Sequence, residues 1–460
     1  MEFRINYLLS ASLLFLLASC GQEDGNGTVI IPSSKTEYKD VPSAQVGDVL
    51  PAWEEGCLDI HSINSGRGES FYYILPDGTT MLVDCAGAPP MELASREGVP
   101  SKPNYSVTSA TVIINYIKHF APTVAGGKLD YFMASHYHGD HIGAWRAAHN
   151  AYSWPMVHGT TPENGGFLIN GLGAVGTEIP ITKVFDRGDW SYHPSADYLD
   201  SMVSKTDDGG IKRYLLYTNF LAWSAKEYGT VRETLVPGRT DQVVLLHDTD
   251  TYGKTFAVRT IAESGDIWTG IGTNVNKSYV PSSEETINNL YRANENINSC
   301  CFHLRYGSFD FFSGGDIQYS GRSTHSWFDI ELPISQVLTK MEVMKASHHG
   351  TANANSQELL NAAKPEHVII GVWNSVQPNP DTIKRFLKAN SGTRFFLTNL
   401  TDENRKTLTD NGVDLSTFSA TGGHIVVRVA PGGRKYWIYV LDDTNQEYKV
   451  KTIFGPYTAQ

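Results

Sequence analysis

A dense group of metal-binding side chains follows directly on a segment with the pattern of a buried strand. Residues 129–134 form a short apolar run, and the sequence SHYHGDH comes next. His136 and His138 are two residues apart, so in an extended turn their side chains point the same way. Asp140 and His141 begin the next element and can face the same point from its other side. Imidazoles beside a carboxylate suit zinc, and also manganese or iron. Four ligands in so short a stretch exceed the needs of one closed tetrahedral site, which favours two ions with positions open to water.

Strand-like and helix-like segments alternate along the rest of the chain. We expect strands over 56–63, 70–75, 80–83, 129–134, 242–246, 255–261, 300–306, 308–312, 341–345, 367–371, 394–397, 424–429 and 436–441, and helices over 112–120 and 381–389. These elements fall in two halves, which predicts sheets covered by helices on their outer faces. Residues 150–235 show no clear core pattern, and we interpret them as a long insertion over the site. Their Trp154, Trp190 and Trp223 are expected either to line a cleft wall or to pack in a core.

The His-x-His-x-Asp-His pattern after a buried strand, with Gly143 just beyond it, resembles the signature of the metallo-β-lactamase superfamily. Residues 58–87 resemble the opening double strand of that fold, and Asp84 matches its aspartate near the first metal. The sequence SGGD, which ends at Asp316, is similar to the motif whose aspartate bridges two metals. The sequence MKASHHG, which ends at Gly350, resembles the final histidine motif. The resemblance runs from about residue 58 to residue 429 with 150–235 unmatched. It implies an α/β fold, namely a four-layer αβ/βα sandwich with a large insertion.

The resemblance also implies a set of ligands. The first metal ion would be held by His136 and His138, the second by Asp140, His141 and His349, and both by a bridging Asp316. The glycine follows His349 directly, as in the family, which favours His349 over His348 as the ligand. His348 would then contact the substrate or donate a proton to the leaving oxygen. Asp140 and His348 are therefore the residues expected to take part in catalysis.

Two assignments stay open at this point. Asp84 would orient a ligand imidazole from behind, although an aspartate at the end of a strand can equally cap a turn. The family's usual third histidine for the first metal has no obvious counterpart here. His158 and His247 are candidates by their order in the chain alone.

Within the superfamily, the double His-His-Gly and the sequence NSCCFHLR at 298–305 resemble two branches. These are the hydrolase domain of the bacterial competence DNA-uptake proteins and the secreted phosphorylcholine esterases. Both branches act on phosphodiesters, so the resemblance implies a dinuclear phosphodiesterase that uses a hydroxide shared by two divalent cations, most simply zinc. Two alternatives remain. In the first, the protein uses the same metals to hydrolyse an ester, lactone or amide. In the second, it has the same fold but is a non-catalytic surface protein that binds a glycan.

The N-terminus resembles the export signal of a bacterial lipoprotein. The apolar run at 7–18 is too short to span a bilayer as a permanent helix. The sequence LASC that follows resembles a lipobox, in which the peptide is cut before Cys20 and the thiol is acylated. We expect a signal peptide over 1–19, a flexible tether over 20–50, the catalytic domain over 51–445 and a tail over 446–460. The mature protein would contact a membrane only through its lipid, at a bacterial outer membrane or cell surface.

The net charge and the cysteine content limit which substrates and which disulfides are expected. The 460 residues include 37 Lys and Arg against 49 Asp and Glu, a formal net charge of −12. A broad basic surface for duplex nucleic acid is therefore not expected. A small-molecule or polymer phosphodiester is the expected substrate, such as a phosphorylated glycan, a phospholipid head group or single-stranded nucleic acid. Five cysteines do not make a disulfide scaffold, and Cys57 and Cys85 can either pair or stay as buried thiols.

Overall fold

The structure of the protein is a computed structural model. It describes residues 41, 43–87, 99, 102–104, 106–143, 155–188, 209–276, 295–319 and 329–460. All described residues belong to one compact unit, Lys39–Gln460. The predicted signal peptide, Cys20, Trp154, Trp190 and most of the predicted tether lie outside the described residues. Within the described part of the chain, every helix is too short or too polar to cross a membrane.

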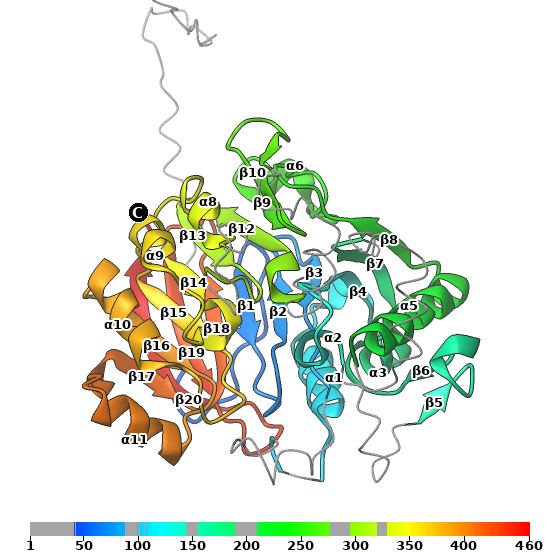
Figure 1. The fold of residues 1–460 in the computed structure, drawn as a ribbon, viewed down its shortest axis with the longest axis horizontal. Helices are drawn as coiled ribbons and strands as arrows, with labels where there is room; N and C mark the ends of the chain where they lie inside the picture. The colour runs from blue at the N-terminus through cyan, green and yellow to red at the C-terminus, as the bar shows by residue number, and fades with distance from the viewer. Residues whose placement is uncertain are drawn as a thin grey trace, which may run out of the picture. The chain divides into compact units, whose positions relative to one another are not determined.

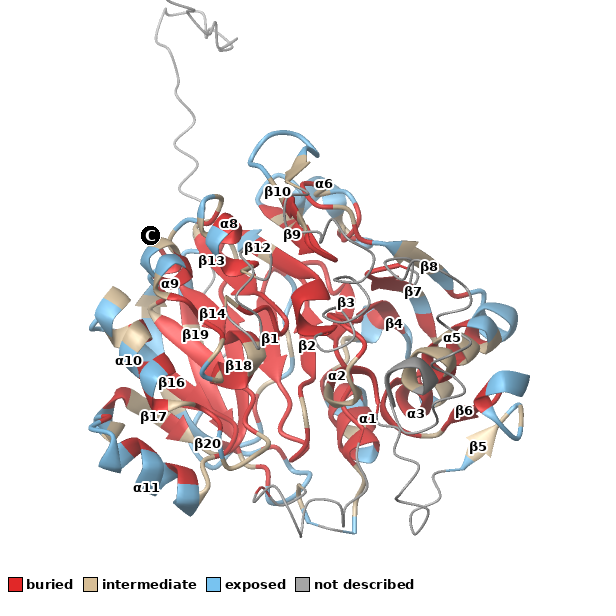
Figure 2. Ribbon diagram, viewed as in Figure 1, coloured by how far each residue is buried: buried red, intermediate tan, exposed pale blue. Residues whose placement is uncertain are grey.

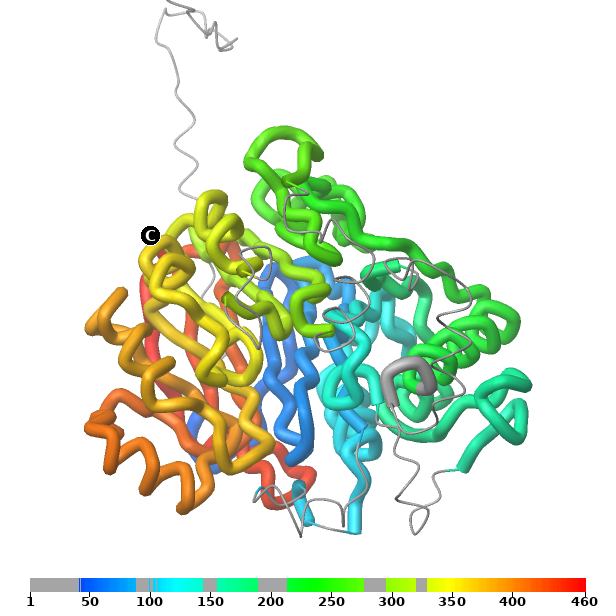
Figure 3. Tube along the Cα trace, viewed as in Figure 1, coloured from blue at the N-terminus to red at the C-terminus, as the bar shows by residue number. Residues whose placement is uncertain are grey.

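The first large sheet joins the two ends of the described chain. Its order is β20-β19-β18-β1-β2-β3-β4-β7-β8 (Figure 1). The strands are β1 (Leu58–Ser62), β2 (Phe71–Ile74), β3 (Thr80–Val83), β4 (Leu129–Met133), β7 (Ile181–Asp186), β8 (Val231–Thr234), β18 (His424–Val429), β19 (Lys435–Leu441) and β20 (Val450–Thr458). Pairing is antiparallel from β20 to β3 and parallel from β3 to β8. Figure 3 shows the red C-terminal strands returning beside the blue N-terminal ones, as the β1–β18 pairing requires.

The second large sheet repeats this plan. Its order is β11-β10-β9-β12-β13-β14-β15-β16-β17. The strands are β9 (Phe256–Glu263), β10 (Asp266–Trp268), β11 (Val275–Asn276), β12 (Cys301–Tyr306), β13 (Phe309–Ser313), β14 (Val343–Lys345), β15 (His367–Ile370), β16 (Arg394–Leu397) and β17 (Phe418–Thr421). Pairing is antiparallel from β11 to β13 and parallel from β13 to β17. A small hairpin of β5 (Met156–Val157) and β6 (Phe167–Leu168) stands apart from both sheets.

Helices cover the outer face of each sheet. The first sheet carries α1 (Ser109–Phe120), α3 (Gly171–Glu178) and α5 (Gly209–Tyr228), and the second carries α8 (Glu331–Ser335), α9 (Gln357–Ala363), α10 (Pro380–Ala389) and α11 (Asp402–Asp410). Two further short helices are α2 (Gly139–Ile142) and α6 (Thr249–Tyr252). In Figure 2 the central strands of the two large sheets are buried, whereas α10 and α11 turn an exposed face outward.

Three apolar cores separate four layers. The middle core lies between the sheets and takes side chains from both, and each outer core lies between a sheet and its helices. Successive residues of a strand face opposite cores, because strand side chains alternate. Tyr72 of β2 faces the helices, for example, and Tyr73 faces the other sheet. The predicted four-layer αβ/βα sandwich is thus confirmed.

Residues 150–235 differ from their predicted description. The stretch supplies β7 and β8 to the first sheet and α3 and α5 to its outer layer, with Val184 and Phe220 buried in the outer core. The stretch therefore contributes to the outer core, although its sequence shows no clear core pattern. The sequence of α3, GLGAVGTE, is rich in glycine, and β8 is an edge strand with partly exposed residues, so neither gives a strong periodic signal. That the stretch is an insertion relative to similar proteins stays a prediction.

Two shorter expectations also need correction. Residues 446–460 are not a tail, because β20 pairs antiparallel with β19 as a mostly exposed edge strand. Residues 242–246 form no strand, although Val243 and Leu245 are buried. Their backbone groups bond to side chains instead of a ladder, as when the N–H of Leu246 donates to Thr79 Oγ1 at 2.8 Å.

Candidate metal centre

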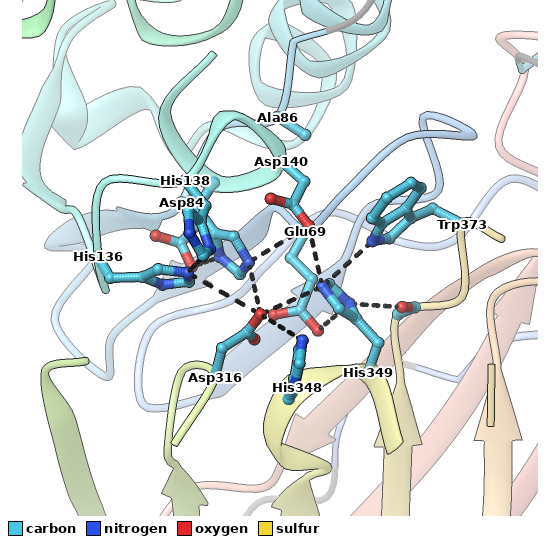
Figure 4. A network of polar contacts seen from close by, with 12 residues as sticks. Glu69, Asp84, Ala86, His136, His138, Asp140, Asp316, His348, His349 and Trp373 are labelled. Carbon is cyan, nitrogen blue, oxygen red and sulfur yellow. Dashed lines mark hydrogen bonds and ion pairs between the residues drawn. The ribbon is translucent and has the colours of Figure 1, made fainter. Parts of the chain in front are cut away.

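The predicted site residues lie where strands of both sheets end. Asp84 follows β3, His136 follows β4, Asp316 follows β13 and His349 follows β14. These strands stand at the change from antiparallel to parallel pairing in their sheets. Ligands of open α/β sheets bind outside the carboxyl ends of strands at such a change. The repeated plan of the two sheets therefore brings groups from both halves of the chain together (Figure 4).

The SHYHGDH segment folds so that its first two imidazoles meet. Nε2 of His136 lies 3.0 Å from Nδ1 of His138. His138 precedes α2, which carries Asp140 and His141 in its single turn. Gly143 ends this helix with φ +118°, a conformation that side chains with a Cβ rarely adopt. The local sequence thus places all four predicted ligands of this segment on one side of a tight turn.

One oxygen of Asp316 is the centre of the site. Its Oδ2 faces the Nε2 atoms of four imidazoles, at 3.2 Å for His141, 3.5 Å for His349, and 3.9 Å for both His136 and His348. Asp316 is 1% exposed. Its other oxygen, Oδ1, is buried and makes no hydrogen bond to the described residues. A carboxylate so placed offers a single oxygen to imidazoles from two other segments of the chain.

His348 and His349 stand in different surroundings. Both have left-handed backbones, with φ +48° and +53°, in a tight turn between β14 and the following loop. His349 is buried, and its Nε2 lies 3.3 Å from Oδ2 of Asp140. His348 is partly exposed and has the amide nitrogens of Gln318 and Asn296 at 2.8 and 3.3 Å from its ring nitrogens. The structure therefore groups His349 with the predicted ligands and leaves His348 at the border of the site, while their roles stay predictions.

Asp84 lies behind the cluster and contacts the imidazole of His141 and the neighbouring Ser135. His141 Nδ1 lies 2.7 Å from Asp84 Oδ2, and the Ser135 hydroxyl donates to the same oxygen at 2.7 Å. The backbone N–H of Ser135 donates to Oδ1 at 2.8 Å. Asp84 adopts φ +61°, which aspartate tolerates better than most residues. The structure thus places this side chain where it can orient His141.

Glu69 and Lys345 are members of the site that sequence reasoning missed. Oε1 of Glu69 lies 3.2 Å from His349 Nδ1, and Oε2 lies 2.7 Å from Lys345 Nζ. The same ammonium lies 3.8 Å from Oδ1 of Asp316 and donates to the carbonyl of Gly315 at 2.7 Å. All three charged side chains are almost fully buried. Lys345 therefore stands between two carboxylates and leaves Asp316 Oδ2 for the imidazoles.

Trp373 is the third group that sequence reasoning missed. Its indole N–H donates to Nε2 of His349 at 3.1 Å. The Gly371 carbonyl, two residues earlier, lies 2.9 Å from Nδ1 of the same ring. The loop after β15 therefore touches both nitrogens of His349. A Cβ on Gly371 would meet the Glu69 side chain at 3.0 Å, so this close approach favours glycine.

The charges of the site favour a cation. Burial opposes protonation of His141, but the carboxylates of Asp316, Asp84 and Asp140 outweigh it and hold its pKa well above the usual value. Burial likewise opposes protonation of His349, and the neighbouring Asp316 and Glu69 still raise its pKa to about 10. Negative groups thus exceed what the local imidazoles neutralise, and the cluster stabilises positive charge at these ring nitrogens.

The geometry fits a divalent metal ion. Around a tetrahedral zinc, neighbouring ligand atoms are about 3.3–3.5 Å apart. The distances between His136, His138 and Asp316, at 3.0 and 3.9 Å, bracket this value. The ligand atoms of Asp140, His141, Asp316 and His349 all lie within 4.8 Å of one another. This group of four is the set that the sequence predicts for the second metal, and its nitrogen and carboxylate donors suit zinc, manganese or iron.

Other sequence candidates lie elsewhere. His158 stacks on Phe167 and Trp223 at 5.4 and 5.1 Å, and that tryptophan packs against the outer core. His247 lies 3.7 Å from Asp130, near the start of β4 rather than its end. Neither therefore joins the cluster as the third histidine of the first metal.

The two cysteines that the sequence leaves open are buried free thiols. Burial raises the pKa of Cys57 to about 12 and that of Cys85 well above its usual range.

Among known proteins, this chain shows similarity to solved structures, whereas the other two comparisons found no match. No protein-family model matches the chain, and no curated protein matches it. One similar structure is Igni18, a metallo hydrolase from the archaeon Ignicoccus hospitalis, with 11% identity, 74% of this chain and 94% of that chain covered, and a TM-score of 0.31. Another is the isothiocyanate hydrolase from Delia radicum gut bacteria, with 10% identity, 80% and 97% coverage, and a TM-score of 0.33.

Proposed function

We propose that this protein is a dinuclear metal-dependent hydrolase of the metallo-β-lactamase type, and that it cleaves phosphodiesters. The observation that carries the proposal is the convergence of four imidazole Nε2 atoms on one buried oxygen of Asp316. The carboxylate of Asp140 adds an oxygen at 3.3 Å from His349. A structural salt-bridge network does not need so many imidazoles around one carboxylate oxygen.

Two divalent cations bound there would lower the pKa of a water molecule toward neutrality, supply the nucleophile and offset charge on the phosphate. The chain's own residues prepare this chemistry. Asp84 and Glu69 lie on the Nδ1 sides of His141 and His349, so each ring presents Nε2 to the centre. His348 reaches the border of the site and is the proposed proton donor to the leaving oxygen.

The proposed substrate is a phosphodiester in a small molecule or polymer. The net charge of −12 disfavours long polyanions held by a broad surface. The lipobox-like LASC sequence supports a lipid-anchored location at a bacterial outer membrane or cell surface. Palmitate labelling of the full chain, with Cys20→Ala as control, tests that part: label that survives the substitution contradicts it.

The catalytic proposal is tested with purified protein that begins after Cys20. We expect about two zinc or manganese ions per chain and metal-dependent turnover of bis-p-nitrophenyl phosphate. Protein that takes up no divalent metal and shows no turnover would contradict the proposal and favour a binding protein. Turnover of lactones or carboxylic esters without phosphodiesters would move the assignment to the ester and lactone hydrolases.

A further inference from the structure

The side chain of Asn355 bonds back to the turn that carries the last two histidines of the site. Its Oδ1 accepts the backbone N–H of Ser347 at 2.9 Å, and its Nδ2 donates to the carbonyl of the same residue at 2.9 Å. Both residues are fully buried. The amide therefore pairs with Ser347 much as a residue of a neighbouring strand would, at the point where β14 has ended.

The turn that follows Ser347 has an uncommon backbone. His348 and His349 adopt φ +48° and +53°, a left-handed conformation that is costly for residues with a Cβ. Within the turn, the N–H of His348 donates to the Gly315 carbonyl at 3.2 Å, and the N–H of Thr351 donates to the His348 carbonyl at 2.9 Å. The two bonds from the Asn355 amide fix the backbone directly before the first left-handed residue.

The backbone of Asn355 is held in turn by α8 and α10, which flank α9 (Figure 1). Its N–H donates to Oε1 of Glu331 at 2.6 Å, and its carbonyl accepts from Nε of Arg385 at 2.8 Å. Glu331 is fully buried and also accepts the N–H of Ser356, and Arg385 also donates to the Ala354 carbonyl at 2.9 Å. Each polar atom of Asn355 therefore has a partner.

The arrangement is costly, which argues for a role beyond packing. Asn355 itself adopts φ +61°, so three left-handed residues with a Cβ lie in one short segment. Glu331 adds a carboxylate that is removed from water, where a charged group is expensive. Backbones of this kind persist where the surrounding contacts enforce them, and they cluster at functional sites. What this set of contacts fixes is the position of the His348–His349 turn.

We propose that Asn355 is a positioning residue for the second metal ion. Its amide holds the backbone of Ser347 and thereby keeps His349 beside Asp140 and Asp316, in the group of four predicted ligands. A ligand that is held in place before the ion arrives binds it more tightly. This inference rests on the proposed function and adds a residue outside the ligand set that sets the affinity for the second ion.

The test compares Asn355→Gly with Asn219→Ala. Glycine adopts φ +61° without strain, so the first substitution removes the two amide bonds alone. Asn219 of α5 also bonds to a loop backbone through its amide, at 2.6 and 2.8 Å to the carbonyls of Pro162 and Gly166. Both variants and the unaltered protein are stripped of metal and titrated with Zn²⁺ against a chromophoric chelator. The binding step that His349→Gln abolishes identifies the second ion.

The affinity for the second ion is the decisive quantity. Asn355→Gly should bind the second Zn²⁺ about 10- to 100-fold more weakly, whereas Asn219→Ala should stay within about 2-fold of the unaltered protein. The first Zn²⁺ should keep its affinity in both variants. Unchanged affinity for the second ion in Asn355→Gly overturns the proposal. An equal loss in both variants, or at both binding steps, also overturns it, because general loosening of the fold would then explain the effect.

A second variant covers the case in which Asn355→Gly fails to fold. Arg385→Lys keeps the charge but loses the fork that donates to the carbonyls of Asn355 and Ala354, and it should weaken the second Zn²⁺ by about 3- to 10-fold. Arg259→Lys is its control, because Arg259 of β9 donates instead to the Gly238 carbonyl at 2.6 Å. Equal affinity in the two arginine variants overturns the proposal. Failure of the proposed function looks different, because then the unaltered protein itself binds no Zn²⁺ or hydrolyses no phosphodiester.

Discussion

Oδ2 of Asp84 lies 2.7 Å from Nδ1 of His141, and the same carboxylate accepts the backbone N–H of Ser135 through its other oxygen. One side chain therefore fixes both the ring of a predicted ligand and the start of the turn that carries His136. With Nδ1 directed at Asp84, Nε2 of the same ring faces Oδ2 of Asp316 at 3.2 Å. The carboxylate also helps to hold positive charge on the His141 ring.

We predict that Asp84→Asn lowers the affinity for Zn²⁺ by about 10- to 100-fold. The amide keeps the size and the tolerance for φ +61° but loses the negative charge that favours a cation on His141. Competition with a chelator measures the affinity, and circular dichroism of the metal-free protein checks that the fold is intact.

Asp130→Asn is the matched control. Asp130 is equally buried, but it accepts the backbone N–H and the hydroxyl of Thr80 at 2.9 and 3.0 Å, near the start of β4. This variant should lose about 1–2 kcal/mol of stability and keep its zinc affinity. Equal losses of affinity in the two variants would contradict the role given to Asp84.

A second prediction concerns Lys345, the buried ammonium between Glu69 and Asp316. Lys345→Met leaves two buried carboxylates without their cation, so the free energy of unfolding of the metal-free protein should fall by about 3–5 kcal/mol. Urea unfolding in the presence of a chelator measures it. The partly exposed Lys340, which pairs with Glu366 at 2.6 Å, provides a control, and Lys340→Met should cost less than about 1 kcal/mol.

Adding Glu69→Gln to Lys345→Met separates charge from packing. The neutral amide removes one uncompensated charge, so the double variant should be more stable than Lys345→Met alone. A double variant less stable than either single one would show that packing of the lysine chain, and not its charge, accounts for the loss.

Local patterns predicted much of the fold and the site. The strands at 80–83, 394–397 and 424–429 were predicted with the bounds that the structure has, because buried strands in a layered fold are continuous apolar runs. His136, His138, Asp140 and His141 share one short segment, so their convergence is a matter of local backbone geometry. Asp316 and His349 carry recognisable neighbours, Gly-Gly before one and Gly after the other.

The remaining residues of the site could not be predicted from the spacing of motifs in the sequence. Glu69 is a lone acidic residue before β2, and Trp373 is a lone aromatic residue after β15. Each joins the site only because the two sheets face one another and β14 and β15 pair in parallel. The edge strands β8 and β20 were not predicted for another reason. Backbone pairing holds them in the sheet, and their largely exposed side chains do not alternate between apolar and polar residues.

The pH dependence of stability follows from two buried neutral histidines away from the site. Burial lowers the pKa of both His367 and His424 to about 4. His424 accepts the backbone N–H of Asn64 at Nδ1, a bond that protonation of that nitrogen would break. Because an unfolded histidine has a pKa of about 6.5, the unfolded chain binds more protons between roughly pH 4 and 6.5. Stability therefore rises with pH across this window and is lost as pH falls through it.

His424→Gln should flatten this dependence. Between about pH 4.5 and 6, one histidine contributes a slope of up to about 1.4 kcal/mol per pH unit to the free energy of unfolding, and the variant should lose that share. Urea unfolding at half-unit pH steps gives the slope. A slope that is the same in both proteins would mean that His424 takes up its proton equally well in the folded state.

The last prediction separates the two neighbouring histidines by their readouts. His349 is buried with its Nε2 3.3 Å from Asp140 and 3.5 Å from Asp316, so His349→Gln should cost the second metal ion and, with it, nearly all turnover. His348 is partly exposed and lies 3.9 Å from Asp316, so His348→Gln should keep both ions. Its kcat should nevertheless fall by about 10²- to 10⁴-fold, because the leaving oxygen loses its proton donor.

Substrates with a better leaving group, such as bis-2,4-dinitrophenyl phosphate, should recover most of that loss in His348→Gln and none of it in His349→Gln. If the metal content falls in His348→Gln and not in His349→Gln, the two assignments are reversed, and His348 is the ligand.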